Sequence, residues 1–316
     1  CPDLPLNVSR SALQNDGFVQ KISEYIAKKV ADKLTGMCKT DREAYEKYWD
    51  DISPFIKFGC IKDSKFADKL HDYILFKDLD NKYLTLKDCI EANKKEEAEH
   101  TEEETQENAE ENKDEKEPEK TTVFYVTDPV QQSQYINMFK EAGKNAVILS
   151  HNIDTAFISH LEQRDQTLQF KRIDADLTEE LKGGDAADDD TAKTLTELFR
   201  KNLNKEKLEV KVESLKNEAV SAMMMLSEES RRMQDMMKMY NMYGMDPGMF
   251  GGQETLVLNI NHPLVKFLAE NQESEHAAVI CEQLYDLAMI SHKQLSPDEM
   301  TKFVQRSNDI LMLLTK

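Results

Sequence analysis

The chain lacks the long apolar runs that membrane-spanning helices need: none of its 316 residues belongs to an uninterrupted hydrophobic stretch approaching about eighteen residues. Cysteine is sparse, and the five cysteines include no Cys-x-x-Cys or other close pair, so we expect reduced thiols, a cytoplasmic location and no structural metal. The seven histidines are also scattered, which predicts surface or helix-capping positions. Because no Ser/His/Asp, Cys/His or glycine-rich phosphate motif is visible, a stand-alone enzyme has little support.

Positive charge is also in short supply. The 60 acidic residues outnumber 41 lysines and arginines, and the formal net charge of −19 argues against nucleic acid or an anionic membrane as a partner, because both bind clustered cationic surface. Much of the excess is local, since residues 96–119 contain thirteen Asp or Glu and only two Lys. This stretch has almost nothing apolar to bury, so we expect a disordered acidic linker over 96–120; a specific recognition role is the alternative.

Hydrophobic periodicity predicts helices before the acidic linker. Apolar residues recur at helical spacing from Phe18 to Leu34, and aromatic-rich stretches at 45–58 and 66–74 predict further helices packed on the first. We expect the aromatic residues of these stretches to form core. A short run at 82–86 then leads into a last helix, so the pattern predicts a helical connector before the linker.

After the acidic linker the pattern changes to short apolar runs. The runs at 123–126, 146–149 and 170–173 alternate with helical segments near 130–142 and 154–163. This strand-helix-strand-helix-strand order predicts a small α/β layer with a parallel sheet.

An aspartate follows each of these three predicted strands: Asp128, Asp154 and Asp174. At such positions a helix cap or a turn is favoured over a catalytic carboxylate cluster. We therefore expect these residues to have local structural roles.

The glycine-containing acidic stretch 183–190 predicts a second linker, which separates an α/β subdomain at 121–182 from a C-terminal domain at 191–316. Ser296-Pro297-Asp298-Glu299 is a helix start signal. The expected fold class is α+β, helix-rich and multidomain. The elements predicted for the C-terminal domain are a helix near 191–203, strands near 208–213, 219–226 and 255–260, and helices near 274–292 and 297–314.

The stretch Leu4-Pro5-Leu6-Asn7-Val8-Ser9-Arg10-Ser11-Ala12-Leu13-Gln14 resembles a loop-to-helix segment of the ninety-kilodalton heat-shock chaperone family. In that family, which includes the bacterial high-temperature protein G type, this middle-domain segment delivers an arginine to the γ-phosphate of ATP. The resemblance covers nearly the whole chain. It implies that residues 1–95 hold the end of the first middle-domain layer and the helical connector, and that the chain is a middle plus C-terminal part without the N-terminal ATPase domain.

The resemblance implies that Arg10 contacts the γ-phosphate, with Gln14 and Asn7 in supporting roles. A planar, permanently charged guanidinium suits a phosphoryl group, and an arginine supplied from another domain is a known device of phosphoryl transfer. Without the resemblance, a lone loop arginine reads as a solvated surface charge. ATP and Mg²⁺ would be bound mainly by the absent N-terminal domain, so we expect no cofactor and no ATP hydrolysis for this chain alone.

Ten of the fifteen methionines fall between Met223 and Met249. Flexible, polarizable methionine surfaces adapt to many shapes and suit promiscuous binding. A helix buried in the core or in a dimer seam is the alternative. The resemblance favours an exposed client-binding segment, and the residues that we assign to it are Met233, Met236, Met237, Tyr240, Met245, Met249 and Phe250.

The two predicted terminal helices carry an apolar stripe that needs a partner. The resemblance implies that the same pair from a second subunit completes a four-helix bundle across a two-fold axis; packing within one chain is the alternative. The residues expected at this interface are Ile280, Leu284, Leu287, Phe303, Ile310, Leu311 and Leu314.

We therefore hypothesise that the chain is the middle and C-terminal part of an ATP-dependent, stress-related chaperone. As a homodimer it would bind unfolded or partly folded clients, with co-chaperones of the bacterial type. The start at Cys1 leads us to expect a fragment. The end at Thr315-Lys316 lacks the acidic Met-Glu-Glu-Val-Asp tail of eukaryotic cytosolic members, which favours a bacterial or organellar type. A dimeric, non-enzymatic adaptor with a Met-rich partner seam is the alternative.

Overall fold

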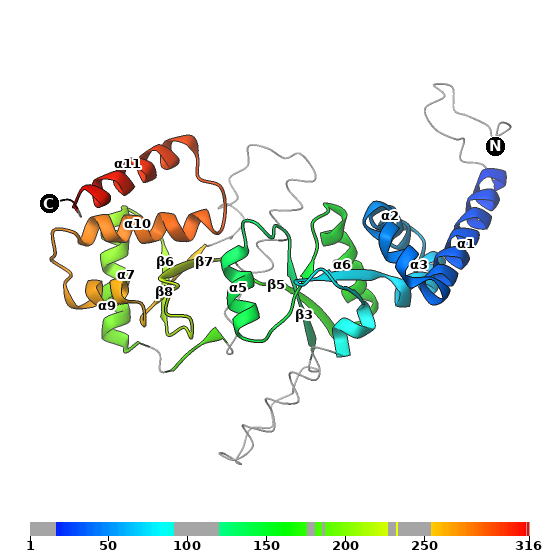
Figure 1. The fold of residues 1–316 in the computed structure, drawn as a ribbon, viewed down its shortest axis with the longest axis horizontal. Helices are drawn as coiled ribbons and strands as arrows, with labels where there is room; N and C mark the ends of the chain where they lie inside the picture. The colour runs from blue at the N-terminus through cyan, green and yellow to red at the C-terminus, as the bar shows by residue number, and fades with distance from the viewer. Residues whose placement is uncertain are drawn as a thin grey trace, which may run out of the picture. The chain divides into compact units, whose positions relative to one another are not determined.

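A computed structural model describes residues 17–91, 120–175, 181–184, 187–226, 232, 254–313 and 315 (Figure 1). The chain divides into two compact units: residues up to Val123 together with His151–Gln169, and Phe124–Ser150 together with Phe170–Lys316. None of the helices in the described ranges has the length and hydrophobicity to cross a bilayer. The α+β class predicted from the sequence is confirmed.

The first unit begins with a group of helices, as the periodicity predicted. These are α1 (Gly17–Thr40), α2 (Arg42–Lys62) and α3 (Ser64–Leu70), followed by a 3₁₀ turn, η1 (His71–Tyr73). Asp63 separates α2 from α3, because its carboxylate accepts hydrogen bonds from the first backbone N–H groups of α3.

The aromatic residues of α2 divide between core and surface. Tyr45 and Trp49 are buried, and each donates a hydrogen bond from its polar group to a backbone carbonyl, Tyr45 to Tyr73 at 2.8 Å and Trp49 to Leu75 at 2.9 Å. Phe55, in contrast, is 76% exposed. The prediction that the aromatic stretch forms core is therefore confirmed for only part of it.

A five-stranded sheet follows, in the order β2-β1-β4-β3-β5. Strands β3 and β4 are parallel, and helices α5 (Ser133–Glu141) and α6 (Ile153–Arg164) lie in the connections, so the predicted strand-helix-strand-helix-strand order is confirmed. The strands are β1 (Leu75–Asp78), β2 (Tyr83–Thr85), β3 (Thr121–Val126), β4 (Val147–Ile148) and β5 (Leu168–Arg172).

The hairpin of β1 and β2 was not predicted as part of this sheet. Its strands pair antiparallel, with Phe76 opposite Leu84, and Asn81 adopts a left-handed conformation (φ 62°) in the turn. The Asp78 side chain accepts hydrogen bonds from the N–H groups of Asp80 and Lys82 and so closes the turn. The Asp80-Asn81 turn signal between two apolar runs would have revealed the hairpin.

The C-terminal part of the second unit contains a three-stranded sheet in the order β6-β8-β7. Strand β8 (Thr255–Asn259) is central, with β6 (Glu209–Glu213) parallel and β7 (Ala222–Met225) antiparallel to it. The helices are α7 (Asp189–Leu203), α9 (Pro263–Glu270), α10 (Ala277–Ile290) and α11 (Pro297–Leu313). All except α9 were predicted.

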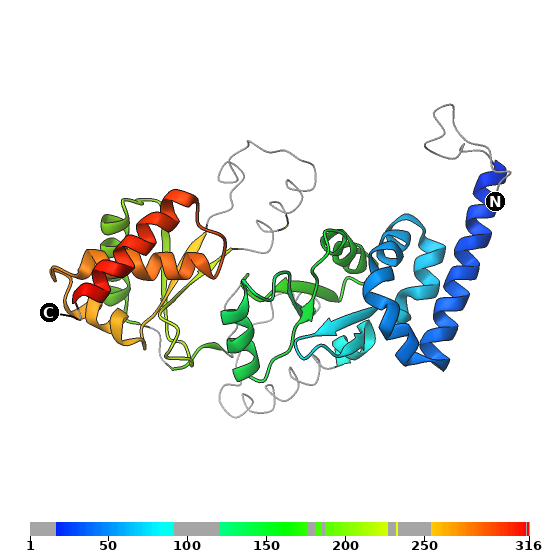
Figure 2. The ribbon, with the colours of Figure 1, turned by 45° about the horizontal axis from the view of Figure 1, so that its top comes forward.

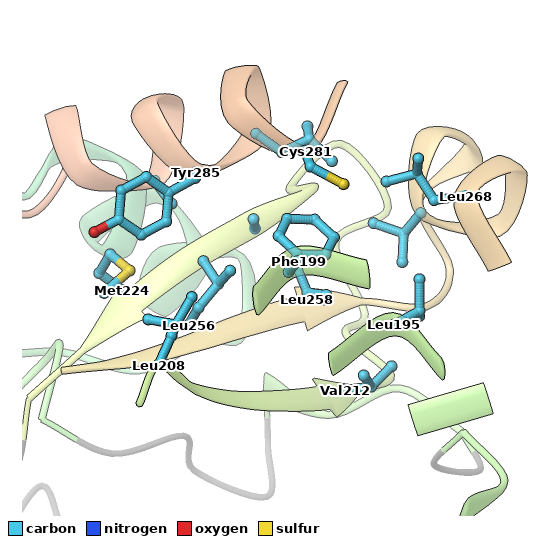
Figure 3. Packing of buried hydrophobic residues seen from close by; sticks show 14 of the residues in the cluster. Leu195, Phe199, Leu208, Val212, Met224, Leu256, Leu258, Leu268, Cys281 and Tyr285 are labelled. Atoms are coloured by element: carbon cyan, nitrogen blue, oxygen red, sulfur yellow. The ribbon is translucent and has the colours of Figure 1, made fainter. Parts of the chain in front are cut away.

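The core of this part lies between the sheet and helices α7 and α10. Figure 3 shows Phe199 of α7 and Tyr285 of α10 directed toward Leu256 and Leu258 of β8. Met224 of β7 belongs to the same cluster and is fully buried, and its neighbours Met223 and Met225 are buried too. These three methionines are therefore core residues of a strand, and the Met-rich surface inferred from the sequence does not include them.

A buried ion pair in the first unit provides a test of the fold. Lys57 of α2 lies 2.5 Å from Asp154 of α6, and both side chains are at most 5% exposed. Asp154 also accepts a hydrogen bond from the backbone N–H of His151. Its role thus combines the predicted local cap with a long-range ion pair that the sequence did not indicate.

We predict that Asp154→Ala lowers the free energy of unfolding by about 3–5 kcal/mol, because the Lys57 ammonium is left buried without its partner. The matched control is Asp68→Ala, which removes an exposed partner of Arg164, also on α6, and should cost less than about 1 kcal/mol. Urea unfolding at neutral pH measures both. Equal, small losses for the two variants would show that the buried pair does not stabilise the unit.

Candidate functional site: the terminal helix pair and a polar clasp

The residues predicted to contact nucleotide and client lie outside the described parts of the chain. This applies to Arg10, Gln14 and Asn7, to Leu314 of the predicted interface, and to the predicted client-binding residues Met233, Met236, Met237, Tyr240, Met245, Met249 and Phe250. The described parts contain the terminal helix pair and the two strand ends between which the Met-rich segment runs.

Helix α10 packs one face into the core of its own unit. Leu284 is 1% exposed and lies in the cluster with Cys281 and Tyr285. Leu284 therefore cannot serve as an exposed interface residue, contrary to the expectation from the sequence. Leu287, another residue of the predicted interface, lies three residues further on and is 44% exposed.

Helix α11 begins with reciprocal capping hydrogen bonds. The Glu299 N–H donates to the Ser296 hydroxyl (3.3 Å), and the Ser296 N–H donates to the Glu299 carboxylate (2.8 Å). This is the capping box that the sequence predicted, with Pro297 at the first helical position. The two Ser296 hydrogen bonds lower the pKa of Glu299.

Polar contacts hold α11 against α10, and the two helices lie alongside each other in both views (Figures 1 and 2). The Arg306 guanidinium of α11 donates hydrogen bonds to Glu282 (2.7 Å), Gln283 (3.0 Å) and Asp286. Ser307 accepts a further bond from Gln283. These contacts fix which face of α11 points away from α10.

No residue of helix α11 is fully buried within the described chain. Met300, Val304 and Leu311 follow one another at helical spacing and are 42–59% exposed. Ile280, Phe303 and Ile310 of the predicted interface are only partly buried. An apolar surface this open, on a helix attached by polar contacts, suits association with another surface.

A cluster of charged residues lies where β5, β8 and α10 end or begin. We call Arg172, Asp174, Glu254, His292 and Lys293 the polar clasp. Its closest atom pairs are Arg172 Nε–Asp174 Oδ1 (2.8 Å), His292 Nδ1–Asp174 Oδ2 (4.0 Å), His292 Nε2–Glu254 Oε1 (3.7 Å) and Lys293 Nζ–Glu254 Oε1 (2.7 Å).

The polar clasp corrects two expectations from the sequence. His292 is buried, whereas the histidines were expected at surface or capping positions; His262, which caps α9, does follow that expectation. Asp174 is buried in ion-pair contact, whereas Asp128 forms the predicted local turn with the N–H groups of Val130 and Gln131. Only the fold brings Asp174 and His292 together, so no local sequence signal marks them.

Burial raises the pKa of Cys60, Cys89 and Cys281 to about 12, which keeps these thiols protonated and unreactive. Within the described ranges, no group of three or more His, Cys, Asp or Glu side chains is arranged to hold a metal ion.

The pKa of the Glu254 carboxyl is strongly lowered. The His292 imidazole, followed by a hydrogen bond and charge from Lys293, lowers the pKa of Glu254 from 4.5 to about 2, against the opposing effect of burial. A carboxyl whose pKa is lower in the folded state stabilises the fold above its unfolded pKa and loses that contribution as pH falls toward the folded pKa.

We therefore predict that Glu254→Gln removes a pH-dependent stabilisation on the order of 2 kcal/mol. Wild type should lose more unfolding free energy than the variant between about pH 4.5 and pH 2, and the difference should be constant above that window. Urea unfolding at a series of pH values measures this. Parallel pH profiles for the two proteins would contradict the assigned interaction.

Comparison with known proteins identifies the family to which the chain belongs. The family model described as Hsp90 protein matches residues 1–100 and 114–316, leaving out only a part of the acidic stretch. The chain is 34% identical over 291 residues to the chaperone protein htpG of Bacteroides fragilis (strain YCH46), covering 88% of this chain and 40% of the relative. It is 32% identical over 284 residues to chaperone protein HtpG of Bacteroides thetaiotaomicron, covering 86% and 39%.

The chain is likewise 32% identical over 291 residues to chaperone protein HtpG of Porphyromonas gingivalis (strain ATCC 33277), covering 86% of this chain and 39% of the relative. It thus spans about 40% of the length of these curated relatives. The family match extends over most of the chain, from the N-terminal helices to the terminal helix pair. The chain therefore belongs to the Hsp90 family.

Proposed function

We propose that the chain is the dimerising and client-binding part of an ATP-dependent molecular chaperone. The observation that carries the proposal is the exposed apolar surface on α10 and α11 in a chain of the Hsp90 family. The matched relatives bear the name chaperone protein, which supports the same activity here. The proposed setting is the cytoplasm, with co-chaperones of the bacterial type.

The terminal helices are proposed to form a two-fold interface. Two copies of a helix pair pack as a four-helix bundle when each presents an apolar stripe to the other. Leu287 of α10 and Val304 and Leu311 of α11 are each at least 44% exposed, so they are available for such packing. Polar contacts between α10 and α11 leave these side chains free to meet a partner.

We predict that the wild-type chain is a dimer and that Leu287→Glu plus Leu311→Glu separates it into monomers, because four carboxylates would then be buried at the interface. Leu264→Glu is the matched control, since Leu264 is 41% exposed on α9, outside the proposed interface, and its substitution should leave a dimer. Light scattering across micromolar dilution measures the mass. A wild-type monomer at every concentration, or a dimer that survives the double substitution, would refute this interface.

The Met-rich segment between β7 and β8 is proposed to bind unfolded or partly folded clients. Its composition supports this, because flexible methionine side chains adapt to differently shaped apolar surfaces. The proposal concerns the residues assigned from the sequence, which lie from Met233 to Phe250; the methionines of β7 are buried and were not assigned to this role.

Arg10 is proposed to act in ATP hydrolysis once a nucleotide-binding domain is present. ATP and Mg²⁺ would be held mainly by that domain, and Arg10 would stabilise charge on the γ-phosphate while Gln14 and Asn7 support it. The support is the match of the N-terminal stretch to the family. On its own the chain is not proposed to be an enzyme.

We predict that Arg10→Ala slows ATP hydrolysis by roughly 10³-fold or more when the chain is joined to the N-terminal domain of a relative, the scale of an arginine-finger loss. Arg10→Lys is the control for charge without the planar fork and should recover only part of the rate. Steady-state phosphate release measures both. An unchanged rate for the alanine variant would remove Arg10 from the mechanism.

A further inference from the structure

The end of β7 and the start of β8, between which the connection runs, are neighbours in the sheet. Met225, the last residue of β7, lies opposite Thr255, the first of β8, in the antiparallel register. The connection thus departs from and returns to neighbouring strand ends. Its sequence contains all seven residues proposed above to bind clients, so the contacts at the two strand ends are of interest for that proposal.

The polar clasp contacts both ends of this connection. At the departing end, the Leu226 N–H donates to the Asp174 carbonyl (3.5 Å). At the returning end, the Glu254 carboxylate accepts a hydrogen bond from Lys293 (2.7 Å) and faces His292. A further attachment is made by Arg232, whose guanidinium donates to the Phe170 carbonyl on β5 (3.0 Å).

His292 joins the two ends through side chains. Its Nδ1 faces the Asp174 carboxylate and its Nε2 faces that of Glu254, so the imidazole stands between the residue that holds the departing end and the residue that begins the return. Arg172 and Lys293 add a positive charge beside each carboxylate. The imidazole presents one nitrogen to each carboxylate, at 4.0 Å from Asp174 and 3.7 Å from Glu254.

The burial of the polar clasp argues for positioning over simple stabilisation. The side chains of Arg172, Asp174 and His292 are 7%, 0% and 2% exposed, respectively. Well-packed apolar side chains often stabilise such a site as much or more, whereas a buried polar network accepts only one geometry. The middle of β7 is fastened independently, because the Tyr135 hydroxyl donates to the Met224 carbonyl (2.5 Å).

We infer that the polar clasp positions the end of β7 and the start of β8 relative to each other, with His292 between Asp174, which holds Leu226, and Glu254, which precedes β8. The role of the connection in holding clients rests on the proposed function; the positioning itself does not. None of the residues of the polar clasp is assigned a contact with a client, so they are positioning residues.

Hydrogen exchange of the backbone amides tests this inference on the wild-type chain and on His292→Gln and Glu254→Gln. In both variants, exchange at 222–226 and 254–259 should accelerate about ten-fold or more, the factor expected for losing a hydrogen bond to a charged group. Exchange at 209–213 in β6 should not change. The control is Glu213→Gln, which removes an ion pair of β6 with Lys182 and should leave the ends of β7 and β8 protected.

A charge-reversed variant separates the bridge from an ordinary ion pair. Glu254→Lys plus Lys293→Glu restores a pair between these two positions but places an ammonium group before His292, so exchange should remain fast. Restored protection in this variant would overturn the bridging role of His292. If His292→Gln accelerates exchange in β6 as well, that variant unfolds the whole unit and does not test the inference. Glu254→Gln then provides the test, because the Glu254 side chain is 24% exposed and its substitution disturbs the core less.

Unchanged exchange at both strand ends in Glu254→Gln would overturn the inference. Suppression of client aggregation, measured on the same proteins, tests the proposed function separately. Fast exchange in the variants, together with no suppression of client aggregation by the wild-type chain, would support the positioning role of the polar clasp and contradict the proposed client binding. Suppression by wild type that falls in the variants at unchanged dimer mass is the result that we expect.

Discussion

The packing of α10 onto the three-stranded sheet is the constraint on which the functional surfaces depend. Cys281, Leu284 and Tyr285 direct one side of α10 into a core shared with β8 and α7. Burying this apolar face provides most of the driving force for the arrangement. Once that face is fixed, the opposite face of α10 and the face of α11 that carries Val304 and Leu311 are left outward, and the chain just after α10 brings His292 beside Asp174.

Two kinds of interaction thus have different tasks in the second unit. Apolar burial determines which side of each helix faces the core, because the hydrophobic effect is not directional. Charged contacts then set particular geometries: Arg306 fixes α11 on α10, and the polar clasp joins the ends of β5, β8 and α10. This division leaves the ends of β7 and β8 defined by a few directional contacts.

The sequence predicted most of the helices and strands in which apolar residues recur at regular spacing. The helices α1, α7, α10 and α11, the strands of the α/β layer and the capping box at Ser296 were all found from local patterns. The hairpin β1–β2 was missed because its first strand continues an apolar helical pattern. The pairing of Lys57 with Asp154 lies beyond any local signal, because 97 residues separate them.

The candidate site was less predictable than the fold, because helical spacing identifies an apolar stripe without showing which part of it a neighbouring sheet covers. Leu284 and Leu287 differ by less than one turn, yet the first is core and the second surface. Similarly, composition counted Met224 in the methionine-rich stretch, and only the structure shows that its strand directs it into the core. The residues assigned to nucleotide and client contact depend on the resemblance to the family and not on the described geometry.

The most direct test of the central claim is to measure, by light scattering, whether this chain suppresses the aggregation of several unrelated proteins that have been unfolded in denaturant. Client binding through an adaptable surface predicts that all of them are protected at comparable, near-stoichiometric amounts of chain. An adaptor with a fixed partner seam would protect none of them and would bind one partner at constant stoichiometry. That second result would contradict the chaperone account.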